Sequence, residues 1–331
     1  MKPVIGIIGA GSWGTALAFT LSKNAEQVYL LARNQEQAAK LTQDRENKKY
    51  LPGYLFPEHL EVHYAYACLA KCDIIISVVP TAHYRSIFKQ MSSEVSLSSH
   101  QIVLNASKGI ELDTGLGMSS IIKEYFPEAK VGVISGPTFA EEVMDDLPTC
   151  CVIAMDNDDD VSQAQLYLSH QRLRCYRSLD LRGVELAGTV KNTMAIASGI
   201  SRGLGFGYNA TSALITRGLA EMIRLGEALN CNPETFMGLS GVGDLISTCS
   251  TDMSRNFQVG LKLAEGKSAE QASAEIGMVT EGVPNTKSIY ALARKHDVRT
   301  PLIDAVHSIL FQEFSATKAL QSLLESEPGT E

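Results

Sequence analysis

A lysine interrupts a stretch of small and apolar residues, GTVKNTMAIASGI (residues 188–200), in which Lys191 lies near the start of a predicted buried helix. A charge removed from water without a partner costs several kcal/mol, so this ammonium group must reach solvent, find a counter-ion or take part in chemistry. When a hydride leaves a carbon, a proton must leave the attached hydroxyl, and a lysine whose pKa is lowered by desolvation or by a neighbouring cation can accept it. Lys191 is therefore a candidate general base. A lysine that extends to solvent from a helix start is the alternative.

A second lysine follows the fourth predicted strand. In LNASKGI, Lys108 stands at the carboxyl edge of the predicted sheet, where doubly wound sheets bind ligands, and it could supply the cation that lowers the pKa of Lys191. A solvated loop lysine is the alternative. One strand later, VISGPTFAEEV repeats the arrangement: Gly136 turns the chain, and Thr138 with Glu141 predicts a helix capping box.

The stretch SGVGDLISTCSTDMSRN holds the other candidate polar residues of the second half. Its glycines predict a flexible turn that leads into Asp244, which could orient Lys191, bond a substrate hydroxyl or cap a turn. Ser254, Arg255 and Asn256 open a predicted helix. A helix N-terminus combined with a guanidinium group is a suitable phosphate site. The alternative is an ordinary N-cap, Ser254, beside two surface polar residues.

The N-terminal stretch VIGIIGAGSWGTALA places Gly9, Gly11 and Gly14 in G-x-G-x-x-G spacing between a predicted strand and a predicted helix. The first glycine permits a tight turn, the second a close approach of the backbone to a pyrophosphate, and the third close packing of helix on strand. In this context the spacing predicts a dinucleotide site, with a glycine-rich turn that binds nothing as the alternative.

Arg33 follows the second predicted strand, at about the place where an acidic residue would favour NAD(H). An arginine there can pair with a 2′-phosphate or stack on adenine, which favours NADP(H). A solvated surface arginine is the alternative.

Apolar runs alternate with amphipathic helical patterns in the first half of the chain, which predicts βαβ units on a mainly parallel sheet. The predicted strands are Val4–Gly9, Gln27–Leu31, Asp73–Val79, Gln101–Asn105, Lys130–Ser135 and Thr149–Met155, with helices such as Thr15–Asn24 and Gly117–Phe126 between them. From about Gly188 only helices are predicted: Asn209–Asn230, Pro233–Gly238, Arg255–Glu265, Ser268–Gly277, Pro284–His296, Pro301–Phe314 and Ala316–Glu325, before a frayed tail, ESEPGTE. The predicted fold class is α/β: an N-terminal Rossmann-like doubly wound sheet (residues 1–188) plus an all-helical C-terminal domain (residues 189–331).

The amino-acid composition limits the classes of partner that this protein is expected to bind. The 331 residues are 45% hydrophobic with a net charge of −8, which does not favour nucleic-acid binding. No stretch of about 18 apolar residues and no signal peptide is visible, so we expect a cytoplasmic protein without membrane insertion. Seven cysteines fit a reducing compartment, and Cys68 with Cys72 is expected to pack in the core. Apolar helices of the second half could supply a homodimer surface.

Two segments resemble metal sites only in spacing. Residues 156–161, DNDDDV, have calcium-loop spacing, but Val161 stands where glycine is required, and a solvated helix start is expected instead. The histidines of residues 59–63 have zinc-protease spacing, but Leu60 takes the place of the glutamate, and residues 51–58 are predicted to be loop. We expect no metal.

Seven motifs occur in one order along nearly the whole chain: GAGSWGTALA, SKGIE, SGPTFAEEV, VELAGTVKN, GLSGVGDLISTC, SRN and VTEGV. In these the sequence resembles the bacterial NAD(P)-dependent glycerol-3-phosphate dehydrogenases. The resemblance implies reduction of dihydroxyacetone phosphate to sn-glycerol 3-phosphate, a phospholipid precursor, with NADP(H) or NAD(H). It also implies that Lys191 is the proton acceptor.

The resemblance further assigns ligand contacts, residue by residue. The implied substrate contacts are Lys108, Gly136, Thr138, Lys191, Asp244, Ser254, Arg255 and Asn256. Besides the glycine loop, the implied cofactor contacts are Ser12, Trp13, Arg33, Lys108, Ala140, Arg255, Val279 and Glu281. Two other functions stay open from the residues alone: a hydroxyacid dehydrogenase with a catalytic lysine, and a sensor that binds a dinucleotide without turnover.

Overall fold

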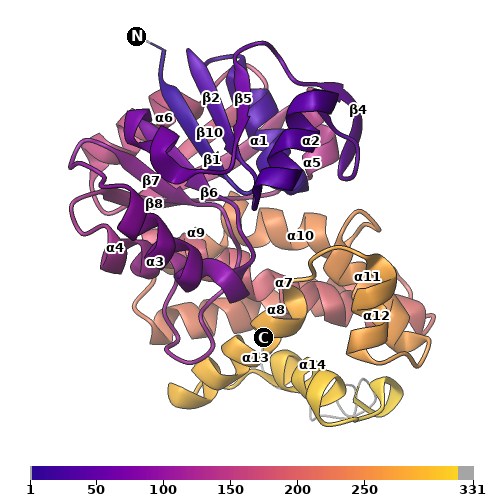
Figure 1. The fold of residues 1–331 in the computed structure, drawn as a ribbon. Coiled ribbons are helices and arrows are strands. Elements are labelled where there is room, and N and C mark those ends of the chain that lie inside the picture. Colours follow the sequence, from indigo (N-terminus) through magenta and orange to yellow (C-terminus); the bar gives the residue numbers. More distant parts are fainter. Residues whose placement is uncertain (1, 320–331) are drawn as a thin grey trace. The chain divides into compact units, whose positions relative to one another are not determined.

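Buried runs of isoleucine, valine and leucine form an eight-stranded sheet in the computed structural model, which describes residues 2–319 (Figure 1). The strands lie in the order β10-β9-β8-β7-β6-β1-β2-β5, and all neighbours are parallel except β8 and β9. Their bounds are β1 Val4–Ile8, β2 Gln27–Leu31, β5 Leu60–His63, β6 Ile74–Ser77, β7 Ile102–Asn105, β8 Lys130–Ser135, β9 Thr149–Met155 and β10 Leu173–Ser178. The order runs outward in both directions from β1, so its carboxyl end is the switch point at which such sheets bind ligands.

Helices cover both faces of this sheet. Ile74 and Ile76 contribute to the core cluster that contains residues of α1 and α6, whereas Ile75 contributes to the cluster that contains residues of α3 and α4. Alternate residues of one strand are thus buried on opposite faces, the pattern of a doubly wound fold. The helices are α1 Ser12–Ser22, α2 Gln35–Asp44, α3 Tyr84–Glu94, α4 Met118–Tyr125, α5 Ala140–Met144 and α6 Asp158–Leu168, with 3-10 turns η1 Tyr66–Lys71 and η2 Thr81–His83.

Two predictions for this half need correction or completion, and a third is confirmed. Strands β5 and β10 were not predicted, because both are edge strands whose partly exposed residues break the apolar run. Residues 51–58, expected to be loop, begin with strand β4 (Leu51–Leu55), which pairs antiparallel with β3 (Glu46–Asn47). The expected solvated helix start at DNDDDV is confirmed, since the Asn157 side chain caps α6.

The remaining elements are helical. They are α7 Leu181–Gly203, α8 Tyr208–Ala228, α9 Pro233–Phe236, a π-helical turn η3 Leu239–Gly243, α10 Asp244–Cys249, α11 Arg255–Ala264, α12 Ala269–Ile276, α13 Gly282–Lys295 and α14 Pro301–Phe311. Residues 316–319 are also helical, and the rest of the predicted helix Ala316–Glu325, like the tail, lies outside the described residues. A Rossmann-like sheet followed by helices confirms the predicted fold class.

The long helix α7 begins earlier than predicted. Asp180 caps it, with Oδ1 accepting from the Gly183 N–H at 2.9 Å, so the helix starts at Leu181 rather than near Gly188. Lys191 consequently lies in the middle of α7, not near its start. A side chain in the middle of a helix cannot extend to solvent beyond the helix end. This position argues against the alternative that Lys191 is a solvated lysine at a helix start.

The described chain divides into two compact units. The first comprises the described residues up to Ser107 together with Leu116–Glu185, and the second comprises Lys108–Gly115 with the described residues from Leu186 onward. The predicted division into a Rossmann-like domain of residues 1–188 and a helical domain of residues 189–331 stays a prediction. The segment Lys108–Gly115 is notable because it leaves the first unit to pack with the second.

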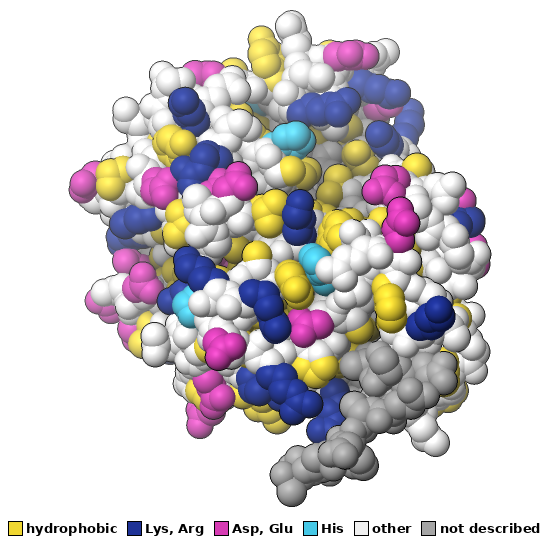
Figure 2. All heavy atoms as spheres, turned by 90° about the horizontal axis from the view of Figure 1, so that it is seen from below, with side chains coloured by type: hydrophobic (Ala, Val, Ile, Leu, Met, Phe, Trp, Pro, Cys, Tyr) yellow, Lys and Arg dark blue, Asp and Glu magenta, His cyan; other side chains and the backbone are white. Residues whose placement is uncertain are grey.

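The surface drawn in Figure 2 places lysine and arginine side chains next to aspartate and glutamate, with hydrophobic side chains between them. Among the described residues, no helix combines the length and the apolar character needed to cross a membrane.

Helices α7 and α11 cross at two glycines. A methyl group on Gly260 would lie 2.2 Å from the Ile196 carbonyl oxygen and 2.8 Å from the Gly199 Cα. We therefore predict that Gly260→Ala lowers the free energy of unfolding by about 3 kcal/mol, although alanine is the better helix former. Gly207→Ala, at the N-cap of α8 with nothing within 4 Å of the added methyl group, should cost no more than about 1 kcal/mol, because only the N-cap preference for glycine over alanine is lost. Denaturant unfolding of both variants tests this, and equal losses would contradict the close crossing.

Candidate active site

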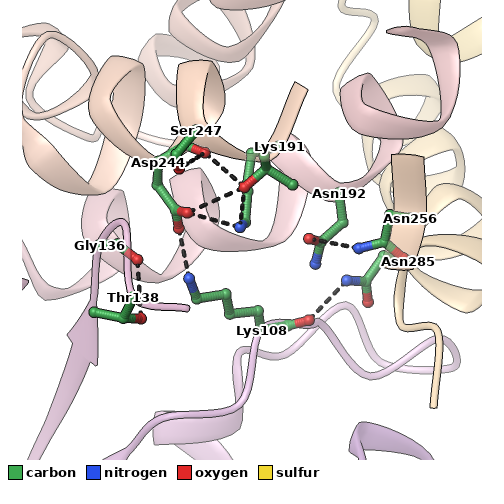
Figure 3. Close-up of polar contacts among 10 residues, drawn as sticks. Lys108, Gly136, Thr138, Lys191, Asn192, Asp244, Ser247, Asn256 and Asn285 are labelled. Atoms are coloured by element: carbon green, nitrogen blue, oxygen red, sulfur yellow. Dashed lines mark hydrogen bonds and ion pairs between the residues drawn. The ribbon is translucent and has the colours of Figure 1, made fainter. Parts of the chain in front are cut away.

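Lys191 is only 7% exposed, and its ammonium group donates to two side chains of the second unit (Figure 3). It donates to Asp244 Oδ1 at 2.7 Å and to Thr248 Oγ1 at 2.5 Å. Thr248 lies one helical turn after Asp244 on α10, and its hydroxyl donates to the Asp244 carbonyl at 2.6 Å. The sequence analysis did not single out Thr248, although its i+4 spacing from Asp244 is a usable signal.

Asp244 is shared by two lysines. Its other carboxylate oxygen, Oδ2, accepts from Lys108 Nζ at 2.5 Å, and the aspartate is only 2% exposed. Of the three roles left open for Asp244, orientation of Lys191 is therefore the one that this geometry supports. Lys108, expected next to Lys191 as a cation, binds the same carboxylate.

The charges set the protonation of this group, which we call the lysine–aspartate cluster (Lys108, Lys191, Asp244). Burial lowers the pKa of Lys191 to about 8; Asp244 opposes this shift and the Lys108 cation adds to it. Burial alone would raise the pKa of Asp244, but the two ammonium groups outweigh it and hold that pKa below its usual value. The cluster thus holds one carboxylate and an amine that can gain or lose a proton near neutral pH.

The approach to Asp244 is a closely packed helical turn, in contrast to the open glycine turn that was predicted. Residues Leu239–Gly243 form the π-helical turn η3, which runs directly into α10. A Cβ on Gly241 would lie 2.0 Å from the Phe236 carbonyl oxygen, so glycine is required there for close packing rather than for mobility. Asp244 is consequently presented by a fixed helix start.

Lys108 is placed by a segment that packs on α13. The Asn285 side chain donates to the Lys108 carbonyl at 2.7 Å (Figure 3). Ile110 lies in the same buried cluster as Ile289 and Leu292. Sequence reasoning missed Asn285, because its partner is a main-chain carbonyl far away in the sequence. The strand-end position alone therefore did not reveal what holds Lys108.

The predicted phosphate site lies at the start of α11. Ser254 is the N-cap, with Oγ accepting from the Phe257 N–H at 3.2 Å, as the alternative interpretation stated. Asn256 is not a simple surface residue: its amide donates to Asn192 Oδ1 and accepts from the Gly282 N–H, both at 2.9 Å. Asn192 follows Lys191 on α7, so this amide pair links the start of α11 to the helix that bears the lysine.

Arg255 contacts the segment before α13. Its Nη1 donates to the Val279 carbonyl at 3.1 Å, while the Val279 side chain is exposed. Glu281, two residues on, is the N-cap residue of α13. The structure thus brings Arg255 and Val279, two of the implied cofactor contacts, into direct contact.

In the first unit, the glycine motif lies at the carboxyl end of β1. Gly9 has a φ of +113°, and a Cβ on Gly14 would lie 1.9 Å from the Gly9 carbonyl oxygen. A Cβ on Gly11 would meet nothing within 4 Å, so the backbone there is open to a ligand. Gly11 is also the N-cap residue of α1 and makes no side-chain cap, which leaves the helix N-terminus directed at that space. These features fit a dinucleotide pyrophosphate.

The other implied cofactor positions of the first unit are near this motif or on its neighbouring strand. Ser12 opens α1, and Trp13 packs on the same apolar cluster as Ala140 of α5. Arg33 is exposed two residues beyond β2, and its main-chain N–H donates to Gln37 Oε1.

The capping box predicted at Thr138 and Glu141 is wrong. Helix α5 begins at Ala140 with Phe139 as its N-cap residue and no side-chain cap, so Thr138 lies one residue too early. Its hydroxyl donates instead to the carbonyl of Gly136, whose φ is +140°.

A buried carboxylate of the first unit was also missed. Glu185 accepts from Asn105 Nδ2 and the Ser119 N–H, both at 2.9 Å, and from the Ser119 hydroxyl at 2.8 Å. Burial raises its pKa, and these hydrogen bonds oppose that shift. Gly117 makes room for it, since a Cβ there would lie 1.9 Å from Glu185 Oε2. Asn105 precedes the segment Lys108–Gly115 and Ser119 follows it, so Glu185 is hydrogen-bonded to the chain on both sides of that segment.

Comparison with known proteins gives consistent matches along the chain. The family model described as NAD-dependent glycerol-3-phosphate dehydrogenase N-terminus matches residues 4–161, and the corresponding C-terminus model matches residues 180–321. Glycerol-3-phosphate dehydrogenase [NAD(P)+] of Syntrophotalea carbinolica is 43% identical over 329 residues, with 97% of each chain covered. The crystal structure of glycerol-3-phosphate dehydrogenase from Coxiella burnetii has a TM-score of 0.93 at 38% identity and covers 98% of this chain and 99% of that chain.

The lysine–aspartate cluster predicts a pH-dependent stability defect. Asp244→Asn leaves the buried Lys191 ammonium and the partly exposed Lys108 ammonium without their carboxylate, which should lower the free energy of unfolding by about 3 kcal/mol at neutral pH. The folded-state pKa of Lys191 then lies even further below its unfolded value, and such a group destabilises the fold most at low pH, where it must be protonated. The deficit should shrink as the pH rises.

Thermal or denaturant unfolding between pH 7 and pH 9 measures this effect. Asp160→Asn, which removes the carboxylate of the partly exposed Lys130–Asp160 pair, is the control and should cost less than about 1 kcal/mol. A deficit for Asp244→Asn that does not change with pH would show that Lys191 is not the group concerned.

Proposed function

We propose how this site works from one premise: the chain belongs to the NAD-dependent glycerol-3-phosphate dehydrogenase family. It is an oxidoreductase that interconverts dihydroxyacetone phosphate and sn-glycerol 3-phosphate with NAD(H) or NADP(H), and it supplies glycerol 3-phosphate for phospholipid synthesis. Membership excludes the hydroxyacid dehydrogenase and the sensor as the main function. The observation that supports the mechanism most directly is the buried Lys191 with its pKa near 8.

Lys191 is the proposed proton donor and acceptor. When bound at the glycine loop, a nicotinamide cofactor would supply the hydride chemistry at the substrate carbon. In the reductive direction the Lys191 ammonium gives a proton to the substrate oxygen, and in the oxidative direction the neutral amine takes the proton from the substrate hydroxyl. Asp244 keeps the Lys191 ammonium oriented, and Lys108 makes proton release easier.

Recognition of the phosphate is proposed for Ser254, Arg255 and Asn256. A guanidinium group beside a helix N-terminus favours a phosphate dianion, and the Asn256–Asn192 hydrogen bond holds this site next to Lys191 along α7. Further substrate contacts are proposed for Lys108, Asp244, Gly136 and Thr138.

The cofactor is proposed to bind at the glycine loop, through Gly9, Gly11, Ser12, Trp13 and Gly14. The open face of Gly11 and the uncapped start of α1 support this. The remaining proposed contacts are Arg33, Lys108, Ala140, Arg255, Val279 and Glu281.

We also propose a cytoplasmic location and a homodimer. None of the seven cysteines, all of which lie among the described residues, forms a disulfide bond, as suits a reducing compartment. Exposed apolar side chains of the second unit, among them Phe206, Tyr208 and Met237, would be covered in a dimer.

The reaction is tested by following oxidation of NADPH and NADH with dihydroxyacetone phosphate. Lys191→Met should lower kcat by about 10²–10⁴-fold with a smaller change in KM, whereas Lys267→Met, in a surface ion pair with Glu275, should not. In the wild type, reduction should slow as the pH rises through about 8, because the ammonium form is lost, and glycerol 3-phosphate oxidation should accelerate over the same range. A near-normal kcat for Lys191→Met, or flat pH profiles, would overturn the role of Lys191.

Arg33 is predicted to select the cofactor. Arg33→Gln removes the cation proposed to pair with the 2′-phosphate, so kcat/KM for NADPH should fall by about tenfold or more while that for NADH is nearly unchanged. Arg33→Lys should retain part of the preference. Equal effects on both cofactors would show that Arg33 does not contact the 2′-phosphate.

A further inference from the structure

The segment Lys108–Gly115 has one polar anchor on α13. The Asn285 side-chain amide donates to the Lys108 main-chain carbonyl at 2.7 Å, and Asn285 is 1% exposed (Figure 3). The segment also makes apolar contacts, since Ile110 lies in the core cluster with Leu292 and a Cβ on Gly115 would lie 3.6 Å from Leu292. Apolar contacts are non-directional, whereas the hydrogen bond from Asn285 to the Lys108 carbonyl is directional and orients the main chain there.

The position of the Lys108 ammonium depends on that main chain. A lysine side chain has several rotatable bonds and loses entropy when its end is fixed. A Cα that is already held in place lowers the entropic cost of keeping the ammonium group in one position. Here the carbonyl of Lys108 is held by Asn285, and its ammonium lies 2.5 Å from Asp244 Oδ2. The residue is therefore fixed at both ends.

From this we infer that Asn285 is a positioning residue for the reaction: it orients Lys108 so that its ammonium meets Asp244 beside Lys191. Asn285 acts through Lys108 and is not proposed to touch the substrate. The inference rests on the role proposed above for Lys108.

Loss of the Asn285 hydrogen bond should change the pKa of Lys191. The Lys108 cation lowers the pKa of Lys191, so an ammonium that is less often in place lets that pKa rise. Asn285→Ala should therefore move the inflection of the pH profile for glycerol 3-phosphate oxidation upward and lower kcat/KM by about tenfold at neutral pH. Removal of the whole cation by Lys108→Met should shift the inflection in the same direction and further.

Ser288→Ala is the matched control. Ser288 is buried on the same helix, 5% exposed, but its hydroxyl donates to the Pro284 carbonyl of its own helix rather than to the Lys108 segment. It should leave kcat/KM and the pH inflection within about twofold and 0.2 units of the wild type. Amide hydrogen exchange gives a readout that does not depend on turnover: residues 108–115 should exchange faster in Asn285→Ala and at the wild-type rate in Ser288→Ala.

The deciding measurement is a double-mutant cycle with Lys108→Met. If Asn285 acts through Lys108, then Asn285→Ala should lower kcat/KM about tenfold in the wild type and less than about twofold in the Lys108→Met background. Equal losses in both backgrounds, or unchanged exchange of residues 108–115, would overturn the inference. Should Asn285→Ala fail to fold, Asn285→Ser takes its place with the same expected outcomes.

Different results would refute the role proposed for Lys108 and the positioning role of Asn285. Full activity of Lys108→Met would overturn the role proposed for Lys108. A strong loss in Lys108→Met together with a wild-type pH profile and wild-type kcat/KM in Asn285→Ala would leave that role intact and refute the positioning role alone.

Discussion

One buried carboxylate shared by two ammonium groups is the interaction on which the rest of the site depends. Asp244 accepts from Lys108 and from Lys191, and both pairs are largely withdrawn from water. With both lysines protonated, the cluster has one positive charge in excess. Such an excess is costly without a ligand and favourable when negative charge develops on a substrate oxygen beside it, which is the requirement for electrostatic stabilisation of an alkoxide. The same excess of positive charge therefore destabilises the free protein and stabilises the negatively charged substrate oxygen during the reaction.

This arrangement requires three rigid supports from distant parts of the sequence. Helix α7 holds Lys191 in its middle, α10 begins at Asp244 after a tightly packed π-helical turn, and α13 holds the main chain of Lys108. Each support depends on a local constraint: the Asp180 cap, the lack of a side chain at Gly241, and the amide of Asn285. Catalytic groups placed on helices keep their geometry more closely than groups on free loops.

Sequence reasoning found most of the framework and part of the site. Continuous apolar strands and the glycine motif predicted the sheet, because parallel strands are buried on both faces. Edge strands β5 and β10 were missed, since partial exposure removes that signal, and the cap at Asp180 was overlooked, which displaced the start of α7. Lys191 was recognisable as a lysine in an apolar run. Asp244 was named as a possible partner of Lys191, but the sequence could not decide among its three possible roles. Asn285 has no sequence signal, because a bond to a backbone carbonyl leaves no trace in residue types.

The pKa of Lys191 is set by opposing effects: burial and the Lys108 cation lower it, and the Asp244 carboxylate raises it. Burial with Asp244 as the sole neighbour would leave the ammonium stabilised by its counter-ion, and burial with Lys108 as the sole neighbour would remove the proton too easily. Together the three influences bring the pKa to about 8, close to neutral pH. An acid–base group works best when its pKa lies near the working pH, because both protonation states are then populated. One lysine can consequently donate a proton in reduction and accept it in oxidation, which a reversible dehydrogenase requires.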